Sequence, residues 1–235
     1  IPAFYSEWLM NRIHAGFLLT RNPFNYHQVS RVSLRPEDVD AIVFWTRNPT
    51  KLLPYIDELT EIGHRFYFQF TLTGYPRLIE SKTLNPHKAL EVFKRLSAKT
   101  GAEKVIWRYD PILFSNLLPI DEHIRLFSKI ASELEGHTRR VVISFADFYQ
   151  KTEKNLKAID SLIYSDITKN HELCLALSQK LSEIARQHGL DIYSCAEEAN
   201  LTGQGIQHGK CIDEALINDL FGLLIPDSKD SGQRE

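Results

Sequence analysis

The stretch Ala41-Ile-Val-Phe-Trp-Thr-Arg-Asn-Pro49 joins a short apolar run to a polar turn, and this pattern recurs along the chain. Short runs rich in Val, Ile, Phe and Tyr that are bounded by turn residues are typical of β-strands. The pattern predicts strands at Gly16–Thr20, Ala41–Thr46, Arg65–Thr73, Lys104–Tyr109, Arg140–Phe145 and Leu190–Cys195.

Apolar residues at helical spacing fill most of the segments between these strands. Asn48-Pro49 and Asn85-Pro86 predict helix starts, because Asn caps a first turn and Pro fits its first position. Gly63, Gly101 and Gly189 predict helix ends. A helix between two strands of one sheet makes the strands parallel, so the sequence predicts an α/β fold with mainly parallel strands.

No glycine-rich phosphate turn follows any of these strands. A doubly wound nucleotide-binding sheet is therefore disfavoured, and we expect a single (β/α) barrel, complete or as a partial TIM-like barrel. Because strand and helix signals alternate throughout the 235 residues, we expect one catalytic domain over residues 1–226 and a polar tail over residues 227–235.

Composition limits the class of protein. The formal net charge of −2 gives no global reason to expect nucleic acid, although a local basic strip can hide inside a neutral total. Three widely spaced cysteines do not form a disulfide framework and favour a reducing cytoplasm. No stretch has the length of apolar sequence that a membrane helix needs, so we expect a cytoplasmic protein without a membrane partner.

Polar residues follow the apolar part of five predicted strands. The carboxyl ends of parallel strands meet on one side of a barrel, where ligands bind. Arginine and carboxylate groups that are buried there are costly unless they pair or bind something. The principal candidates for binding or polarising a ligand are Arg47, Arg108, Asp110, Glu197 and Glu198. A structural ion pair between Arg108 and Asp110 is an equally weighted alternative.

Other features favour structural interpretations. Trp45 and Trp107 precede strand-end arginines and are interpreted as core residues rather than as ligand-stacking groups. His208-Gly-Lys-Cys211 offers only two metal ligands, too few to close a site alone. The glycine-rich segment Leu201–Lys210 is expected to be a mobile surface loop, and Cys174 a buried small residue.

Motifs of zinc proteases, serine hydrolases and P-loop NTPases are absent from the sequence. A hydrolase of ordinary type would therefore depend on carboxylates, with Asp110 and Glu197 as an acid–base pair. A non-catalytic ligand-binding module using the same polar residues stays open as another alternative.

Long motifs across nearly the whole chain resemble one bacterial family, catalogued as domain of unknown function 1848. The likeness includes Gly209-Lys-Cys-Ile-Asp213 near the end. Its other motifs are Ile1-Pro-Ala-Phe-Tyr-Ser-Glu-Trp8, Arg21-Asn-Pro-Phe-Asn25, Val43-Phe-Trp-Thr-Arg-Asn-Pro49, Phe68-Gln-Phe-Thr-Leu-Thr73, Val105-Ile-Trp-Arg-Tyr-Asp-Pro-Ile112 and Cys195-Ala-Glu-Glu198.

The resemblance implies a circularly permuted radical S-adenosylmethionine (SAM) barrel, distantly similar to spore photoproduct lyase, which acts on DNA lesions. It implies a [4Fe–4S] cluster whose cysteines lie beyond Glu235, reductive cleavage of SAM, and an electron donor such as flavodoxin or ferredoxin. The substrate is unidentified, and the overall charge does not support nucleic acid. Residues implied to hold cofactor or substrate are Thr46, Arg47, Asn48, Gln69, Thr71, Arg108 and Ser144, with Asp110, Glu197 and Glu198 facing the same cavity.

The same resemblance gives Cys195 and Cys211 a second meaning, because the family's C-terminal segment brings extra cysteines that can join them around an auxiliary iron–sulfur cluster. The simpler alternative is that Cys195 fills the end of a strand and Cys211 a loop pocket.

Overall fold

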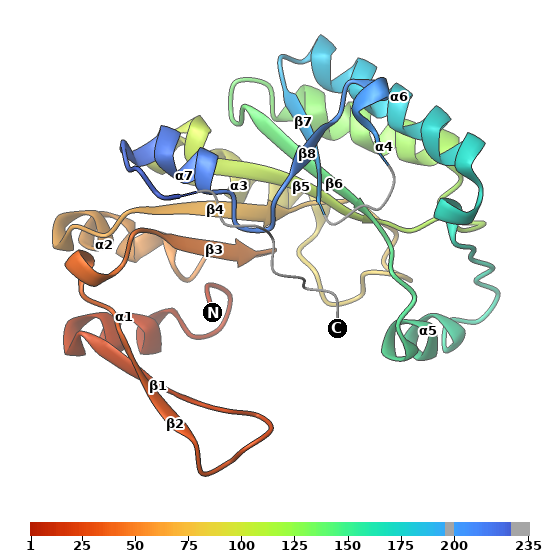
Figure 1. The fold of residues 1–235 in the computed structure, drawn as a ribbon. Helices are drawn as coiled ribbons and strands as arrows, with labels where there is room; N and C mark the ends of the chain where they lie inside the picture. Colours follow the sequence, from red (N-terminus) through yellow and green to blue (C-terminus); the bar gives the residue numbers. More distant parts are fainter. Residues whose placement is uncertain (196–199, 227–235) are drawn as a thin grey trace.

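A computed structural model describes residues 1–195 and 200–226. Its centre is a six-stranded parallel sheet whose strands lie in the order in which they occur along the chain (Figure 1). The strands are β3 (Ile42–Thr46), β4 (Phe66–Thr71), β5 (Val105–Ile112), β6 (Arg140–Phe145), β7 (Asp191–Cys195) and β8 (Gln207–Gly209). Five of the six predicted strands thus belong to this sheet.

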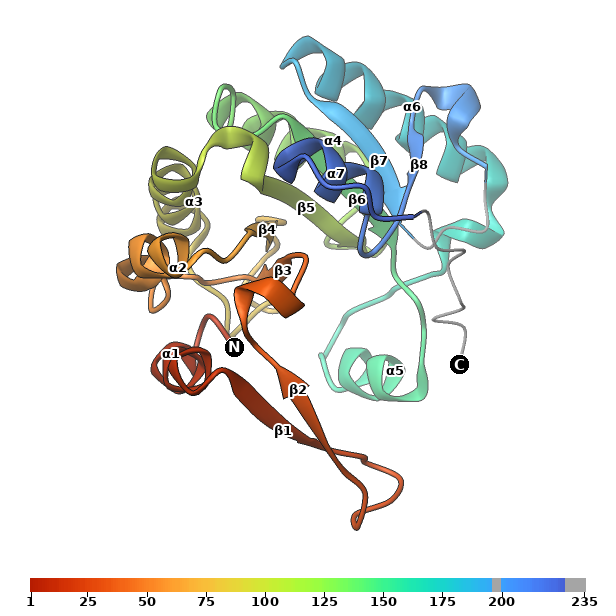
Figure 2. The same cartoon turned by 60° about the vertical axis from the view of Figure 1, so that its left-hand side comes forward.

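Helices cover both faces of the sheet, unequally (Figures 1 and 2). On one face lie the crossover helices α2 (Ile56–Ile62), α3 (Pro86–Thr100), α4 (Ile120–Glu133) and α6 (His171–Gln187). On the other lies α7 (Glu214–Phe221), and we call this side the α7 face. The remaining helices are α1 (Ser6–Ala15) and α5 (Gln150–Lys157). Short 3-10 turns cover Pro36–Asp38, Leu53–Tyr55, Ala102–Lys104, Ile167–Lys169 and Thr202–Gln204.

The sheet is open, because β3 and β8 are its two edges and do not pair with each other. The expected complete barrel is therefore not what the structure shows. A closed TIM barrel needs about eight strands. Here helix α7 packs against the face of the sheet that would line the interior of a closed barrel. What holds is the α/β class with a parallel sheet flanked by helices.

The first predicted strand has a different place. β1 (Phe17–Arg21) pairs antiparallel with β2 (Val29–Ser33) in a separate two-stranded hairpin. β2 carries Ser30, Arg31 and Ser33, and all of its residues but Ser33 are exposed, so it lacks the apolar run used to predict strands. The hairpin projects from the body of the molecule beside β3 (Figure 2).

Two apolar clusters, one on each face of the sheet, explain why the strand sequences are continuous runs of apolar residues. Phe68 and Phe70 of β4 pack with the crossover helices, in a cluster that includes Phe93 and Leu96 of α3. Tyr67 of the same strand points to the opposite face, where it shares a smaller cluster with Ile106, Val142, Cys195 and Ile217 of α7. β4 and β5, in the middle of the sheet, are thus buried on both sides over their first halves.

Several local predictions hold and others need correction. Asn85 caps α3 by accepting a hydrogen bond from the His87 amide at 3.0 Å. No helix starts at Asn48-Pro49: the Asn48 side chain instead accepts from the Thr50 amide at 3.1 Å in a turn, and α2 begins at Ile56. Gly63, Gly101 and Gly189 follow helix ends as expected.

The glycine-rich segment is more ordered than a surface loop. It contains a 3-10 turn and β8, and both Leu201 and Ile206 are buried. Gly209 pairs with Cys195, and a Cβ at this position would lie 3.0 Å from the Ser194 carbonyl oxygen. The glycine is needed for the close approach of β8 to β7, which the sequence alone did not reveal.

None of the helices in the described part of the chain is long and apolar enough to cross a membrane.

Candidate functional site

Polar side chains gather on the α7 face, where the strands approach their carboxyl ends. Side chains alternate between the two faces of a strand, so Gln69 lies on the side of Tyr67, and Arg108 lies on the side of Ile106. The first half of this face is apolar and covered by α7. The second half carries the polar network described below.

Arg108 is the centre of the network. Its Nε and Nη2 donate to Oδ2 of Asp110 at 2.8 and 2.5 Å, and its Nη1 donates to Oε1 of Gln69 at 2.6 Å. The Arg108 side chain is only 3% exposed and that of Asp110 is 14% exposed. A charge-assisted, nearly buried pair of this kind has a fixed geometry.

The charge of Arg108 is secured by this environment. Burial by itself lowers its pKa, but the hydrogen bonds and negative charge of Asp110 outweigh burial, and the pKa is raised above the ordinary value. The Cys195 side chain adds to the same upward shift. The α7 face therefore holds a permanent positive charge beside a carboxylate.

Trp45 and Trp107 differ in their surroundings. Trp107 is fully buried in the core, as expected, and donates from Nε1 to the Leu72 carbonyl oxygen at 2.8 Å. Trp45 is 41% exposed, and the Arg108 guanidinium lies 4.5 Å from its ring centre. The core interpretation is thus wrong for Trp45, which forms a cation–π contact and keeps an accessible ring surface.

Cys195 and Cys211 lie together at the other side of Arg108. Their Sγ atoms are 3.2 Å apart and are not joined in a disulfide. Gln69 holds the second of them in place, since its Nε2 donates to the Cys211 carbonyl oxygen at 2.7 Å. Two residues from separate segments are thus brought into a thiol pair at the edge of the polar network.

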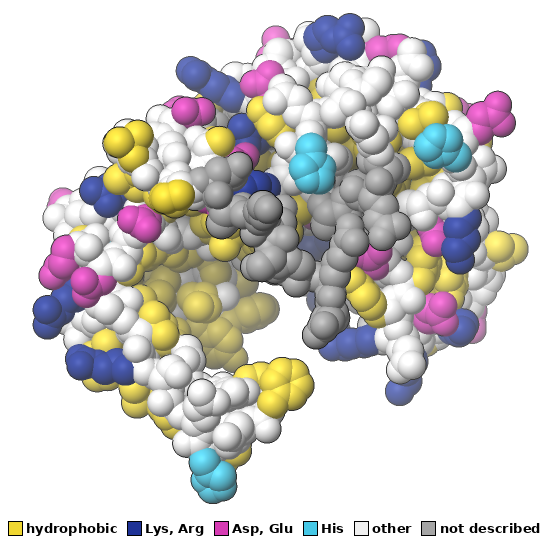
Figure 3. Space-filling model, in the orientation of Figure 1, with side chains coloured by type: hydrophobic (Ala, Val, Ile, Leu, Met, Phe, Trp, Pro, Cys, Tyr) yellow, Lys and Arg dark blue, Asp and Glu magenta, His cyan; other side chains and the backbone are white. Residues whose placement is uncertain are grey.

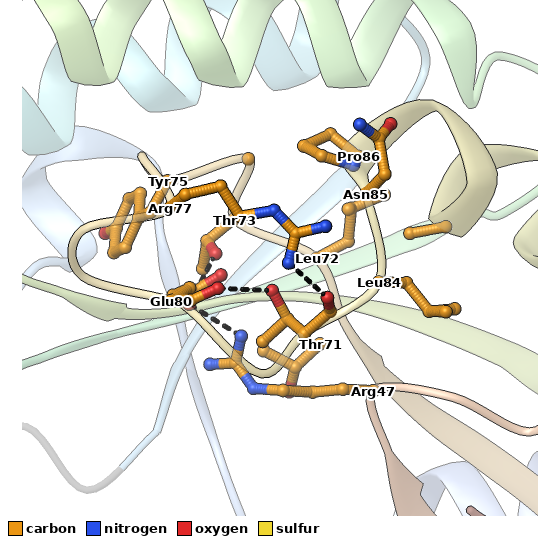
Figure 4. A pocket seen from close by; sticks show the side chains of 13 residues that line it. Arg47, Thr71, Leu72, Thr73, Tyr75, Arg77, Glu80, Leu84, Asn85 and Pro86 are labelled. Carbon is orange, nitrogen blue, oxygen red and sulfur yellow. Dashed lines mark hydrogen bonds and ion pairs between the residues drawn. The ribbon is translucent and has the colours of Figure 1, made fainter.

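A second polar cluster occupies a small depression where the loop after β4 folds over the end of β3 (Figure 4). Arg47 donates from Nη1 to Oε1 of Glu80 at 2.6 Å, and Thr73 donates to the same oxygen at 2.9 Å. Thr71 joins the two clusters: it lines the depression, and its hydroxyl lies 3.4 Å from Oδ1 of Asp110. Glu80 was not among the predicted residues.

The other predicted residues have different positions. Thr46 lies on the same face of β3 as Phe44, away from Trp45, and its Oγ1 accepts from the Asn48 amide at 3.0 Å. Ser144 is half-buried in β6. The predicted Glu197 and Glu198 fall outside the described residues. The structure thus brings Arg108, Asp110, Gln69, Thr71, Cys195 and Cys211 together, with Arg47 in the adjoining cluster, while Thr46 and Asn48 form a local turn.

Two further predictions concern metal ligands and cysteine burial. His208 is exposed on β8, and the described residues contain no group of three or more His, Cys, Asp or Glu side chains that can hold a metal ion. Cys174 is buried in α6, as expected.

Fold and site together define an α/β protein with a fixed, charged network at the carboxyl ends of an open parallel sheet. The chain matches the family described as Domain of unknown function (DUF1848) over residues 1–235, and it belongs to that family. The resemblance seen in the sequence motifs is thus confirmed at the level of the family. No curated protein matches the chain.

Proposed function

We propose that this chain is the barrel-like domain of a radical-SAM-type enzyme, with cofactor and substrate bound at the polar ends of its strands. The observation that carries the proposal is the Arg108 network, a charged group held at the carboxyl edge of a parallel sheet, where α/β proteins bind their ligands. The sequential order of the six parallel strands supports this barrel-like assignment.

The donor set fits SAM, which carries a carboxylate, an ammonium group and a planar adenine. Arg47, whose side chain is 37% exposed, suits the carboxylate. Asp110 suits the ammonium group, with Thr71 as a neighbouring hydroxyl. The accessible ring of Trp45 suits adenine.

The fit to an iron–sulfur cluster is partial. A [4Fe–4S] cluster that binds SAM needs three thiolates, and the described residues bring only Cys195 and Cys211 together. We therefore keep the main cluster on cysteines expected beyond Glu235 and propose the thiol pair for an auxiliary cluster. When bound, the main cluster supplies the electron for reductive cleavage of SAM, delivered by a donor such as flavodoxin or ferredoxin.

In this proposal the chain's own residues bind the ligand, orient the charged groups around it and shield it from water. Asp110 and Gln69 hold the Arg108 guanidinium in one position, so its charge is oriented before a ligand arrives. α7 covers the first half of the face and excludes water from beneath the network. Such shielding suits radical chemistry, which is damaged by stray hydrogen donors.

The metal-free alternative uses Asp110 as an acid–base group. Both oxygens of this carboxylate already face donors, Oδ2 toward Arg108 and Oδ1 toward Thr71. This arrangement suits a residue that orients Arg108 and accepts from an ammonium group better than one that exchanges protons, so we place the radical-SAM proposal first.

The experiment is an assay of SAM cleavage on the full-length protein, purified and reconstituted without oxygen. We expect iron–sulfur absorbance and formation of 5′-deoxyadenosine after reduction, with no product in the unreduced control. An iron-loaded, reduced protein that binds SAM without cleaving it would contradict the proposal and favour a ligand-binding module. Turnover of a substrate by iron-free protein would favour the acid–base alternative.

A further inference from the structure

The charge of this chain is distributed unevenly. Residues 8–36 contain four arginines and no Asp or Glu, so in a chain of net charge −2 the rest carries −6. This segment includes the projecting β1–β2 hairpin, on which Arg21 and Arg31 are exposed. The hairpin is therefore a local basic element that the overall charge conceals.

Aromatic side chains alternate with these arginines. Phe24 is 98% exposed and Tyr26 is 73% exposed at the tip of the hairpin. The Arg21 guanidinium lies 3.9 Å from the ring centre of Tyr26, and that of Arg31 lies 4.1 Å from the ring centre of Phe17. Cations interleaved with accessible rings are typical of surfaces that bind phosphates and stack bases.

The tip of the hairpin is held by its own hydrogen bonds. The Asn22 side chain donates to Gln28 at 2.7 Å and accepts from the Phe24 amide at 2.9 Å. Asn25 accepts from the His27 amide at 3.2 Å. These contacts fix the backbone that presents Phe24, so little conformational entropy is lost when its ring packs against a ligand.

A second basic element stands across the open side of the sheet. α5 and the hairpin extend on either side of the region where the strands end (Figures 1 and 2). The surface is hollowed between these two elements (Figure 3). Lys151 and Lys154 of α5 are exposed, and Tyr149 just before the helix is 66% exposed. Two acidic groups nearby, Asp147 and Glu153, hydrogen-bond to Tyr149 and Lys157.

We propose that the hairpin and α5 together bind a single-stranded nucleic acid. The cations of both elements contact its phosphates, and Phe24 and Tyr26 stack on its bases. A linear polyanion can contact both the hairpin and α5 and cross the hollow between them. A flat membrane resting on the hairpin tip would not contact α5. This inference rests on the proposed function only for the chemistry that follows binding.

The test is fluorescence anisotropy of a labelled single-stranded DNA oligonucleotide at several salt concentrations, using full-length protein. We expect Phe24→Ala to weaken binding about tenfold, as for loss of one stacked base. Arg21→Gln combined with Arg31→Gln should reduce the slope of log Kd against log salt by about 1.4, because each phosphate contact on a single strand contributes about 0.7. Lys151→Gln combined with Lys154→Gln should have a similar effect.

The matched controls lie elsewhere on the surface. Leu224, which is 97% exposed after α7, controls for loss of an exposed apolar side chain, and Arg125 on α4 controls for loss of a cation. Leu224→Ala and Arg125→Gln should leave binding unchanged. Equal losses in the controls, or an affinity that does not depend on salt, would overturn the inference.

Competitors separate other ligands. Base stacking would be overturned if two results occurred together: heparin competes equally well in wild-type and Phe24→Ala protein, and Phe24→Ala leaves oligonucleotide binding unchanged. The site would then be a general polyanion-binding surface. Binding to phosphatidylglycerol vesicles but not to oligonucleotide would overturn the inference in favour of a membrane. Because binding needs neither reductant nor SAM cleavage, failure here leaves the proposed function standing, and failure of SAM cleavage leaves binding standing.

Discussion

Oδ2 of Asp110 accepts two hydrogen bonds from the Arg108 guanidinium, at 2.8 Å from Nε and 2.5 Å from Nη2, within the nearly buried network. The two residues are separated by one position on β5, so they lie on the same face of the strand. Their pairing neutralises two charges that would otherwise be costly to bury. It also holds the Arg108–Asp110 ion pair in one orientation at the edge of the site.

Removing one member of this pair should destabilise the protein. We expect Arg108→Met to lower the free energy of unfolding by about 3 kcal/mol, because Asp110 is left without its partner. Urea denaturation measures the loss. Arg125→Met is the control, since Arg125 forms an exposed pair with Glu122 of the kind worth at most about 1 kcal/mol. Equal losses in the two variants would contradict a buried, paired Arg108.

His123 should make stability depend on pH. It is fully buried, with Nδ1 3.0 Å from the Tyr109 hydroxyl and Nε2 3.2 Å from the Leu113 carbonyl oxygen. Burial lowers its pKa from 6.5 to about 4, so the folded protein keeps it neutral where the unfolded chain binds a proton. The free energy of unfolding should therefore fall as pH drops from 6.5 toward 4, by about 3 kcal/mol in all.

The measurement is urea denaturation at several pH values for wild type and His123→Gln. Carboxylates titrate in both proteins, so the difference between the two pH profiles isolates the histidine. Parallel profiles between pH 6.5 and 4 would show that His123 does not contribute.

Cysteine variants test the proposed auxiliary cluster. In full-length protein purified without oxygen, Cys195→Ser and Cys211→Ser should each lower the iron content, because each removes one thiolate of the 3.2 Å pair. Cys174→Ser is the matched control, since Cys174 is buried in α6 in the cluster of the opposite face. Unchanged iron content in both site variants would show that Cys195 and Cys211 do not hold an auxiliary cluster.

Much of the fold follows from local pattern. The apolar strands and the crossover helices between them predict a parallel sheet, and Asn85 and Gly101 set the two ends of α3. The openness of the sheet does not follow, because strand pairing at the edges is a long-range property. β2 was missed since its exposed polar residues carry no burial signal.

Some features of the site could likewise be predicted from the sequence, and others could not. Arg108 and Asp110 share a face because their spacing on a strand requires it, and this is visible in the sequence. The same alternation places Thr46 on the face opposite Trp45, a distinction that the grouping of all strand-end residues overlooked. Glu80 contacts Arg47 from a loop 33 residues away, and no local signal marks it.

Binding of SAM to cluster-loaded, full-length protein shows whether the polar strand ends are the ligand site. Equilibrium dialysis without oxygen should show affinity reduced about tenfold or more in Arg47→Met, because a charge-assisted contact to the carboxylate is lost. Arg125→Met, on α4 of the opposite face, should match wild type. Equal affinities in all three proteins would show that SAM does not bind at the polar strand ends.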